Sequence, residues 1–187
     1  MELTQIINRI YTLPQESAAK LEEAVKEVSF PKGHILLRSD KVETDVYFIK
    51  RGIVRAYSVL DGNEVTFWFG HEGDTALSMR SYVQNKKSYE DIELLEESEF
   101  YMLKSQCLQE LFTEDLHIAN WGRKFAENEL IKTEERLISR QFKSASERYS
   151  DLLKETPHLL QRVQLGHIAS YLGITQVSLS RIRASIK

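Results

Sequence analysis

The chain has 187 residues, of which 42% are hydrophobic and 28% are charged, and its formal net charge is −3. This length allows one domain of about 130–140 residues and a small additional module. Apolar runs stay well short of the ~20 residues needed to span a bilayer, the N-terminus lacks a signal-peptide pattern, and the single cysteine, Cys107, excludes an internal disulfide. We therefore expect a cytoplasmic globular protein.

The first predicted domain, residues 1–104, begins with helices and continues in strands. Residues 2–27 are expected to be helical on both sides of Pro14, whereas residues 28–104 change to the period of two that is typical of strands. Asp61-Gly62 stands between two β-branched and aromatic runs, which is a strong hairpin signal. Many short strands between helices predict a β-roll. The helical faces are expected to carry Ile6, Ile7, Ile10, Leu21, Ala24, Val25 and Val28.

Residues 105–142 are predicted to form a long helix that mediates dimerisation. It contains no proline, and residues recur along it at intervals of seven, as in a coiled-coil seam. The alternative is a helix that packs only on its own β-roll, with Trp121 and Phe125 facing inward. We favour a helix that does both. The seam positions are Leu116, Arg123, Leu130 and Leu137, alternating with Ala119, Ala126, Thr133 and Arg140.

Residues 143–187 are predicted to form a separate C-terminal module. Ser144 and Glu147 have the spacing of a capping box, and a short helix is expected to continue to Glu155 before Pro157. From Arg140 onward, eight Lys and Arg face three Asp and Glu, a net of +5, so residues 1–139 carry −8. A basic module on an acidic body is what a phosphate-binding end of the chain requires.

The last 25 residues predict a helix-turn-helix. A short helical pattern ends at Gly173, where a glycine can adopt the positive φ of a sharp turn, and Thr175 is a good N-cap for a second helix over residues 175–186. An ordinary helical hairpin with a solvated polar face is the alternative interpretation. The apolar stripe of the second helix is assigned to Val177 (or Ser178), Leu179, Ile182 and Ile186.

The polar face of the second helix carries side chains suited to DNA. Glutamine can bind adenine edges and arginine can bind guanine, while hydroxyl groups serve bases or phosphates. We expect base and near-base contacts from Thr175, Gln176, Ser178 and Arg181, and phosphate contacts from Arg183, with Arg162 and Lys187 as further candidates.

This order of segments resembles the cyclic-AMP receptor protein/Fnr (Crp/Fnr) family of bacterial transcription regulators. The resemblance covers nearly the whole chain, through the motifs at residues 30–33, 46–52 and 73–77 and the terminal helix-turn-helix. It implies an α+β fold with an N-terminal β-roll, a long dimerisation helix and a C-terminal winged helix-turn-helix. It also implies a homodimer on palindromic double-stranded DNA, with a small effector and RNA polymerase as further candidate partners.

The same resemblance implies an effector pocket formed by Gly73, Asp74, Ala76, Leu77, Ser88 and Thr133. Members of the family that bind cyclic nucleotides have Glu at the position of Asp74 and Arg at the position of Ser88. The neighbouring Lys86 and Lys87 lack the planar fork with which arginine binds phosphate. We therefore expect an unknown ligand or none, rather than cyclic AMP, and no resident cofactor or metal.

Other functions fit the sequence less well. One cysteine cannot hold an iron–sulfur cluster, and His34, His71 and His117 are isolated, which argues against haem. A cupin-like metal enzyme would need a His-x-His motif that the chain lacks, so no catalytic residues are predicted. The remaining alternative is a ligand-binding β-roll module without DNA activity of its own.

Overall fold

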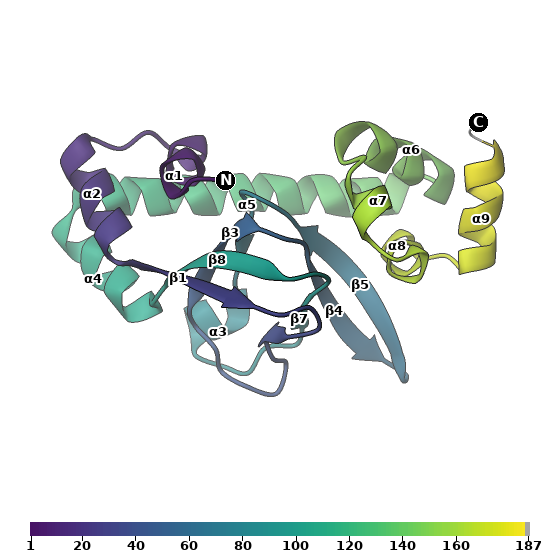
Figure 1. Ribbon diagram of the computed structural model, residues 1–187, viewed down its shortest axis with the longest axis horizontal. Helices are drawn as coiled ribbons and strands as arrows, with labels where there is room; N and C mark the ends of the chain where they lie inside the picture. The colour runs from purple at the N-terminus through teal and green to yellow at the C-terminus, as the bar shows by residue number, and fades with distance from the viewer. Residues whose placement is uncertain (186–187) are drawn as a thin grey trace. The chain divides into compact units, whose positions relative to one another are not determined.

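The computed structural model describes residues 1–185 (Figure 1), and Ile186 and Lys187 lie outside the described residues. Helices α1 (Leu3–Ile10) and α2 (Gln15–Glu23) precede a run of strands. These are β1 (Val25–Phe30), β2 (Ile35–Leu37), β3 (Val46–Arg51), β4 (Val54–Leu60), β5 (Asn63–Gly70), β6 (Thr75–Ala76), β7 (Asp91–Leu94) and β8 (Ser98–Leu103), with helix α3 (Met79–Gln84) between β6 and β7. Helices α4 (Ser105–Glu114), α5 (Leu116–Phe142), α6 (Ala145–Glu155), α7 (Leu159–Arg162), α8 (Leu165–Leu172) and α9 (Gln176–Ser185) follow.

The chain divides into two compact units. The first comprises residues 1–56 and 69–130, and the second comprises residues 57–68 together with the chain from residue 131 onward. All three boundaries fall inside elements, because the strands β4 and β5 and the helix α5 each run from one unit into the other. None of the helices within residues 1–185 is long and apolar enough to cross a membrane.

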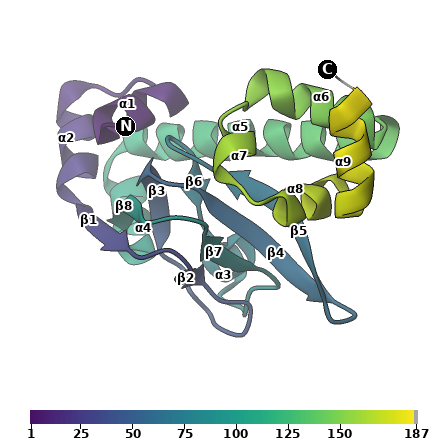
Figure 2. The ribbon, with the colours of Figure 1, turned by 45° about the vertical axis from the view of Figure 1, so that its right-hand side comes forward.

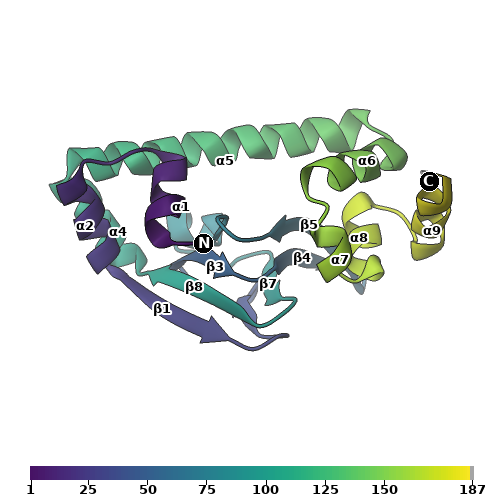
Figure 3. The same cartoon turned by 45° about the horizontal axis from the view of Figure 1, so that its top comes forward.

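Two four-stranded sheets make up the predicted β-roll. One has the order β1-β8-β3-β6, with β8 antiparallel to both of its neighbours (Figure 3), and the other has the order β2-β7-β4-β5 (Figure 2). Asp61 and Gly62 both have positive φ, 52° and 78°, as a two-residue hairpin turn requires, which confirms the predicted hairpin between β4 and β5.

The core of the first unit lies between its helices and the sheet that contains β3 and β8. Trp121 of α5 is 1% exposed, packs edge-on against Phe48 at 6.1 Å and donates a hydrogen bond from Nε1 to the carbonyl of Ile7 at 3.1 Å. Trp121 thus faces inward, as predicted. The helices contribute Ile6, Ile7, Leu21, Leu108, Ile118 and Trp121 to this core, and the strands contribute Val46, Phe48, Tyr101 and Leu103.

The structure corrects three sequence-based expectations. Residues from Val25 onward form β1, not the end of a helix, because they pair with β8 from Val25↔Leu103 to Phe30↔Ser98. Helix α3 interrupts the predicted strand region. The long helix predicted from Ser105 breaks at Asp115, which has φ −134° and separates α4 from α5.

Asp115 explains that break, because its carboxylate caps the start of α5. Oδ1 accepts from the backbone N–H of His117 at 3.0 Å and of Ile118 at 3.4 Å. The Lys20 ammonium donates to Oδ2 at 2.9 Å and the Ser17 hydroxyl binds both oxygens. Lys20 above all, assisted by Ser17 and the two amides, lowers the Asp115 pKa to about 2. The carboxylate therefore holds α2 against α5.

Helices α6 to α9, together with the end of α5 from Ile131, form the helical part of the second unit. Ser144 and Glu147 form the predicted capping box, and α6 ends at Glu155 as expected. Between residues 143 and 185 the structure describes helices and no strand, so the wing implied by the family resemblance is not seen there. The buried residues of this part are Tyr149, Leu152, Leu159, Val163, Ile168, Ala169, Leu172 and Leu179.

Two polar side chains, Arg148 and Ser170, join separate elements of the second unit by hydrogen bonds. Arg148 of α6 donates from Nη1 to the carbonyl of Arg140 in α5 at 3.0 Å and from Nη2 to the carbonyl of Leu172 at the end of α8. The hydroxyl of Ser170 in α8 accepts from the backbone N–H of Thr66 at 2.9 Å and donates to the carbonyl of Glu64 at 3.0 Å. The first half of β5 is thereby hydrogen-bonded to α8.

We predict that Asp115→Asn lowers the free energy of unfolding at pH 7 by about 1–3 kcal/mol, since the charged cap and the Lys20 contact are lost. The folded-state pKa lies below the unfolded value of about 3.9. The stabilisation is therefore complete above the unfolded pKa and disappears as the pH falls towards 2. Urea unfolding from pH 7 to pH 2.5 should show the difference between wild type and variant closing. Exposed Asp40, changed to Asn, is the control; a difference that stays constant with pH would refute this role.

Candidate DNA-binding surface and effector region

The turn between α8 and α9 has the predicted geometry. Gly173 adopts φ 67° and ψ 34°, a left-handed conformation that glycine reaches without steric cost. Its N–H donates to the carbonyl of Ser170 at 3.0 Å, and the next N–H, of Ile174, donates to Ala169 at 3.0 Å. These bonds satisfy carbonyl groups that the end of a helix would leave without partners. The chain therefore leaves α8 sharply and enters α9 three residues later.

Thr175 caps the N-terminus of α9, as predicted. Its Oγ1 accepts from the backbone N–H of Ser178 at 3.2 Å, and the two hydroxyls lie 3.0 Å apart. Ser178 is half-buried, so this predicted DNA contact is engaged in the cap. The cap fixes the first turn of α9 in position.

The outer face of α9 exposes the other predicted side chains. Gln176, Arg181 and Arg183 are exposed, whereas Leu179 is fully buried against the rest of the module. Val177 is 61% exposed, so it belongs to the outer face, not to the apolar stripe. Helix α9 contains two arginines and no acidic residue, so its exposed face is positively charged. Arg162 is exposed at the end of α7, and the candidate Lys187 and the stripe residue Ile186 lie outside the described residues.

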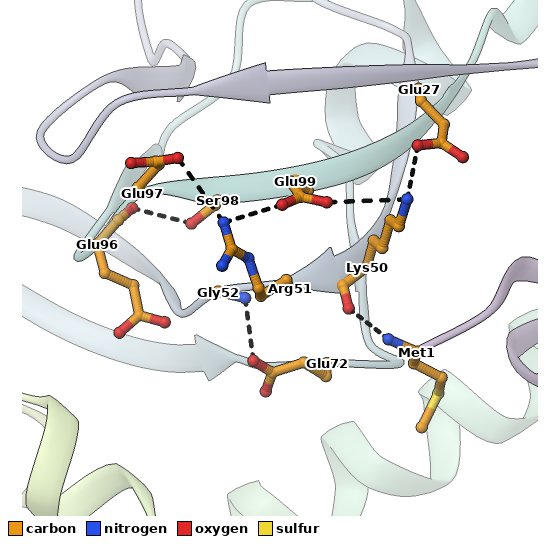
Figure 4. Close-up of polar contacts among 10 residues, drawn as sticks. All are labelled: Met1, Glu27, Lys50, Arg51, Gly52, Glu72, Glu96, Glu97, Ser98 and Glu99. Atoms are coloured by element: carbon orange, nitrogen blue, oxygen red, sulfur yellow. Dashed lines mark hydrogen bonds and ion pairs between the residues drawn. The ribbon is translucent and has the colours of Figure 1, made fainter.

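The predicted effector turn in the first unit is firmly joined to the end of β3 (Figure 4). Gly73 has φ 92° and donates its N–H to the carbonyl of Ile49 at 2.9 Å, and the N–H of Ile49 donates to the carbonyl of Asp74 at 2.9 Å. The carboxylate of Glu72 accepts from the N–H of Gly52 at 3.0 Å. The backbone of this turn is therefore held in one conformation.

The carboxylate of Asp74 is directed at its own turn. Oδ2 accepts from the backbone N–H of His71 at 3.1 Å and lies 3.6 Å from Nε2 of the same histidine. Binding a ribose hydroxyl would have to compete with these contacts. The remaining predicted members of this segment are buried Ala76 and half-buried Leu77.

Ser88 is buried and closed into a turn of its own. Its hydroxyl accepts from the N–H of Glu90 and donates to the carbonyl of Glu90, both at 3.1 Å, and its backbone N–H donates to Lys41 at 3.2 Å. Ser88 precedes β7, whereas Ala76 lies in β6, so the two halves of the predicted pocket belong to different sheets. Thr133, in the second unit, accepts a hydrogen bond from Arg136 of its own helix at 3.0 Å.

The charges near Ser88 are unsuited to an anion. Glu90 is 7% exposed, and its Oε2 is buried without a hydrogen-bond partner in the described part of the chain. The carboxyl group of Glu90 therefore offers a phosphate no positive charge. Arg55 of β4, 2% exposed, forms an ion pair of 2.7 Å with Glu93 of β7, which neutralises its charge. Neither Glu90 nor the Arg55–Glu93 pair supplies a cation for a cyclic phosphate, and the exposed Lys86 and Lys87 beside Ser88 lack the planar fork of arginine.

Sequence reasoning missed Glu90, Arg148 and the glycine of α8, Gly166. Glu90 lies two residues after Ser88, so its position beside the predicted pocket was available as a signal. Arg148 and Gly166 act through contacts with Leu172 and Gln176, which are 24 and ten residues away in the chain. No local pattern marks either contact.

Known proteins resemble this chain in one domain and in the overall fold. Residues 27–115 match the cyclic nucleotide-binding domain family. The fold is similar to that of FixK2 from Bradyrhizobium japonicum, with a TM-score of 0.73 and 22% identity over 87% of this chain and 84% of that one. It is also similar to the catabolite activator protein of Thermus thermophilus, with a TM-score of 0.60 and 17% identity over 95% and 85% of the two chains. A sequence comparison with curated proteins finds no significant match.

A third similar structure is the c-di-GMP-responsive global regulator CLP of Xanthomonas campestris, with a TM-score of 0.68 and 14% identity over 92% of this chain and 91% of that one. At these identities the likeness shows a shared fold. The domain match at residues 27–115 and the fold shared with these three structures are what relate the chain to known proteins.

We predict that Gly173→Val destabilises the C-terminal module by about 1–2 kcal/mol, because a β-branched residue is strained in the left-handed conformation. The space around the missing Cβ is open, so backbone strain alone is tested. Gly173→Asn is the matched control, since asparagine tolerates this conformation better. Thermal unfolding followed by circular dichroism measures both, and a valine variant that melts like the wild type would contradict the turn.

Proposed function

We propose that the chain is a cytoplasmic, homodimeric, sequence-specific DNA-binding transcription regulator of the Crp/Fnr type. The starting point is the match of residues 27–115 to the cyclic nucleotide-binding domain family. The observation that carries the proposal is the turn at Gly173, which joins α8 to an α9 whose outer face is exposed, polar and basic. Such a helix fits the major groove of DNA.

The exposed side chains of α9 have distinct tasks in this proposal. Gln176 and Arg181 contact base edges, because carboxamide and guanidinium groups form paired hydrogen bonds with adenine and guanine. Thr175 and Ser178 hold the first turn of α9 and lie next to the DNA backbone. Arg183 and Arg162 bind phosphates, which adds affinity but no sequence preference.

Dimerisation through α5 is supported by the apolar side chains that the helix leaves exposed. Leu116, Leu130 and Leu137 follow the seven-residue repeat and are 75%, 70% and 64% exposed. Ile131 and Ile138, one position later in the repeat, are 52% and 50% exposed. An apolar stripe with this spacing is typical of a helix that packs against a partner helix. A second copy of the chain is the proposed partner, and the twofold symmetry of the pair would place two α9 helices on a palindrome.

The proposed effector is a small molecule other than cyclic AMP, or there is none. By the family resemblance, Ser88 stands where an arginine would bind the cyclic phosphate, and its hydroxyl is hydrogen-bonded within its own turn. The domain match keeps one alternative open, a ligand-binding β-roll without DNA activity. Salt-dependent binding to DNA distinguishes the two, because release of counterions accompanies phosphate contacts. RNA polymerase is a further candidate partner of the DNA-bound dimer.

Arg181→Ala is predicted to weaken binding to the selected DNA site by about 1–3 kcal/mol and to relax the preference at one base position of each half-site. Titration of labelled duplexes, with each position substituted in turn, measures both effects. Arg183→Ala is the control on the same helix and should weaken all sequences alike. Uniform weakening by Arg181→Ala would show that it binds only phosphate.

Leu137→Glu is predicted to shift the protein from dimer to monomer, because a carboxylate in an apolar seam would lose its hydration. Leu60→Glu is the matched control, since Leu60 is equally exposed, at 64%, but lies on the β4–β5 hairpin. Sedimentation velocity over a range of concentrations measures both variants. Equal dimerisation of the Leu137 variant and the wild type would contradict the proposed seam.

A further inference from the structure

Gly166, in the first turn of α8, leaves space that the side chain of Gln176 occupies. A Cβ built on Gly166 would lie 2.6 Å from Nε2 of Gln176 and 3.7 Å from its Cδ. Gly166 lies within a helix and is not among the glycines with positive φ in the described chain. Glycine is a poor helix former, so its backbone conformation gives no reason for glycine at this position. The close approach of Gln176 does.

We propose that Gly166 is a positioning residue for sequence recognition: by lacking a side chain, it lets the carboxamide of Gln176 lie against α8 in the orientation that reads a base. This inference rests on the proposed function, in which Gln176 contacts a base edge. Gly166 need not contact DNA itself, yet in this proposal it determines which base Gln176 prefers.

The physical reason is the orientation that a carboxamide needs. Paired hydrogen bonds to adenine require the oxygen and the nitrogen of the amide to lie in the plane of the base. A glutamine on an open helix surface loses the freedom of its side-chain torsions when it binds. Gln176 is the first residue of α9, and packing over Gly166 restricts it before DNA arrives. Preorganisation of this kind reduces the cost of binding.

A methyl group on Gly166 would disturb recognition and leave the fold intact. The atoms that it would meet belong to the far end of a flexible side chain, which can move aside at little cost. Alanine also favours the helix more than glycine does. Gly166→Ala should therefore melt at the same temperature as the wild type or higher, while the carboxamide of Gln176 is displaced.

The test uses the full-length protein and four variants: Gly166→Ala, Gln176→Ala, the double variant, and Ser146→Ala. Ser146 is exposed on α6, so its replacement raises helix propensity elsewhere in the same unit and controls for stiffening of the module. A preferred site is first selected from random DNA with wild-type protein. Binding to that site and to duplexes substituted at each position is then titrated for every variant.

We expect Gln176→Ala to lose about tenfold in discrimination at one base position of each half-site. Gly166→Ala should lose discrimination at the same position, and the double variant should lose no more than Gln176→Ala alone, because both changes remove one interaction. Ser146→Ala should keep the wild-type preferences. Thermal unfolding, measured in parallel, should show no loss of stability in Gly166→Ala.

Three results would overturn the inference while the proposed function stands: unchanged preferences in Gly166→Ala, a change at a different position from that of Gln176→Ala, or general loss of binding with a lowered melting temperature. The last would show that Gly166 serves the fold alone. If the wild type selects no preferred site at all, the proposed function fails, and this inference fails with it.

Discussion

The guanidinium of Arg148 links α6 to α5 and to the end of α8, the helix that precedes α9. From α6 it binds the carbonyl of Arg140 in α5 and the carbonyl of Leu172, the last residue of α8. Carbonyl groups at helix C-termini lack partners within the helix, and a cation satisfies them well. Gly173 follows Leu172 directly and turns the chain into α9, so the contact fixes the point from which α9 starts. The hydrogen bonds of Ser170 attach the first half of β5 to the same helix.

The β-roll matches the cyclic nucleotide-binding domain family over residues 27–115, and its predicted effector residues are engaged in hydrogen bonds within their own turns. Backbone hydrogen bonds between the end of β3 and the turn at Gly73 preserve the shape of the effector segment. Ser88, at the predicted phosphate position, is neutral, and its hydroxyl is hydrogen-bonded to the backbone of Glu90 within its own turn. A shared fold does not fix a ligand, because the ligand is chosen by a few side chains. The same fold can therefore serve different effectors.

Local signals predicted the parts of this structure that depend on neighbouring residues. The hairpin at Asp61-Gly62, the capping box at Ser144 and the turn at Gly173 are all confirmed. The features that the sequence did not predict depend on contacts between residues far apart in the chain. Val25 begins a strand because β8 pairs with it, although its spacing fits a helix. Asp115 ends one helix and caps the next through partners that include a serine 98 residues earlier in the chain. Of the candidate DNA contacts, sequence pattern identified the exposed side chains of α9, but not the space left for one of them by α8.

The most direct test of the central claim is the salt dependence of binding to a selected palindromic duplex, measured with and without cyclic AMP. Two phosphate-binding arginines in each of two protomers predict a slope of about −3.6 for the logarithm of the binding constant against the logarithm of salt concentration. For a regulator that is not controlled by cyclic AMP, we expect this slope both with and without cyclic AMP. Binding that does not change with salt would contradict a DNA-binding regulator. Binding that appears only when cyclic AMP is added would contradict the proposal that the chain, with Ser88 in place of a phosphate-binding arginine, is not controlled by cyclic AMP.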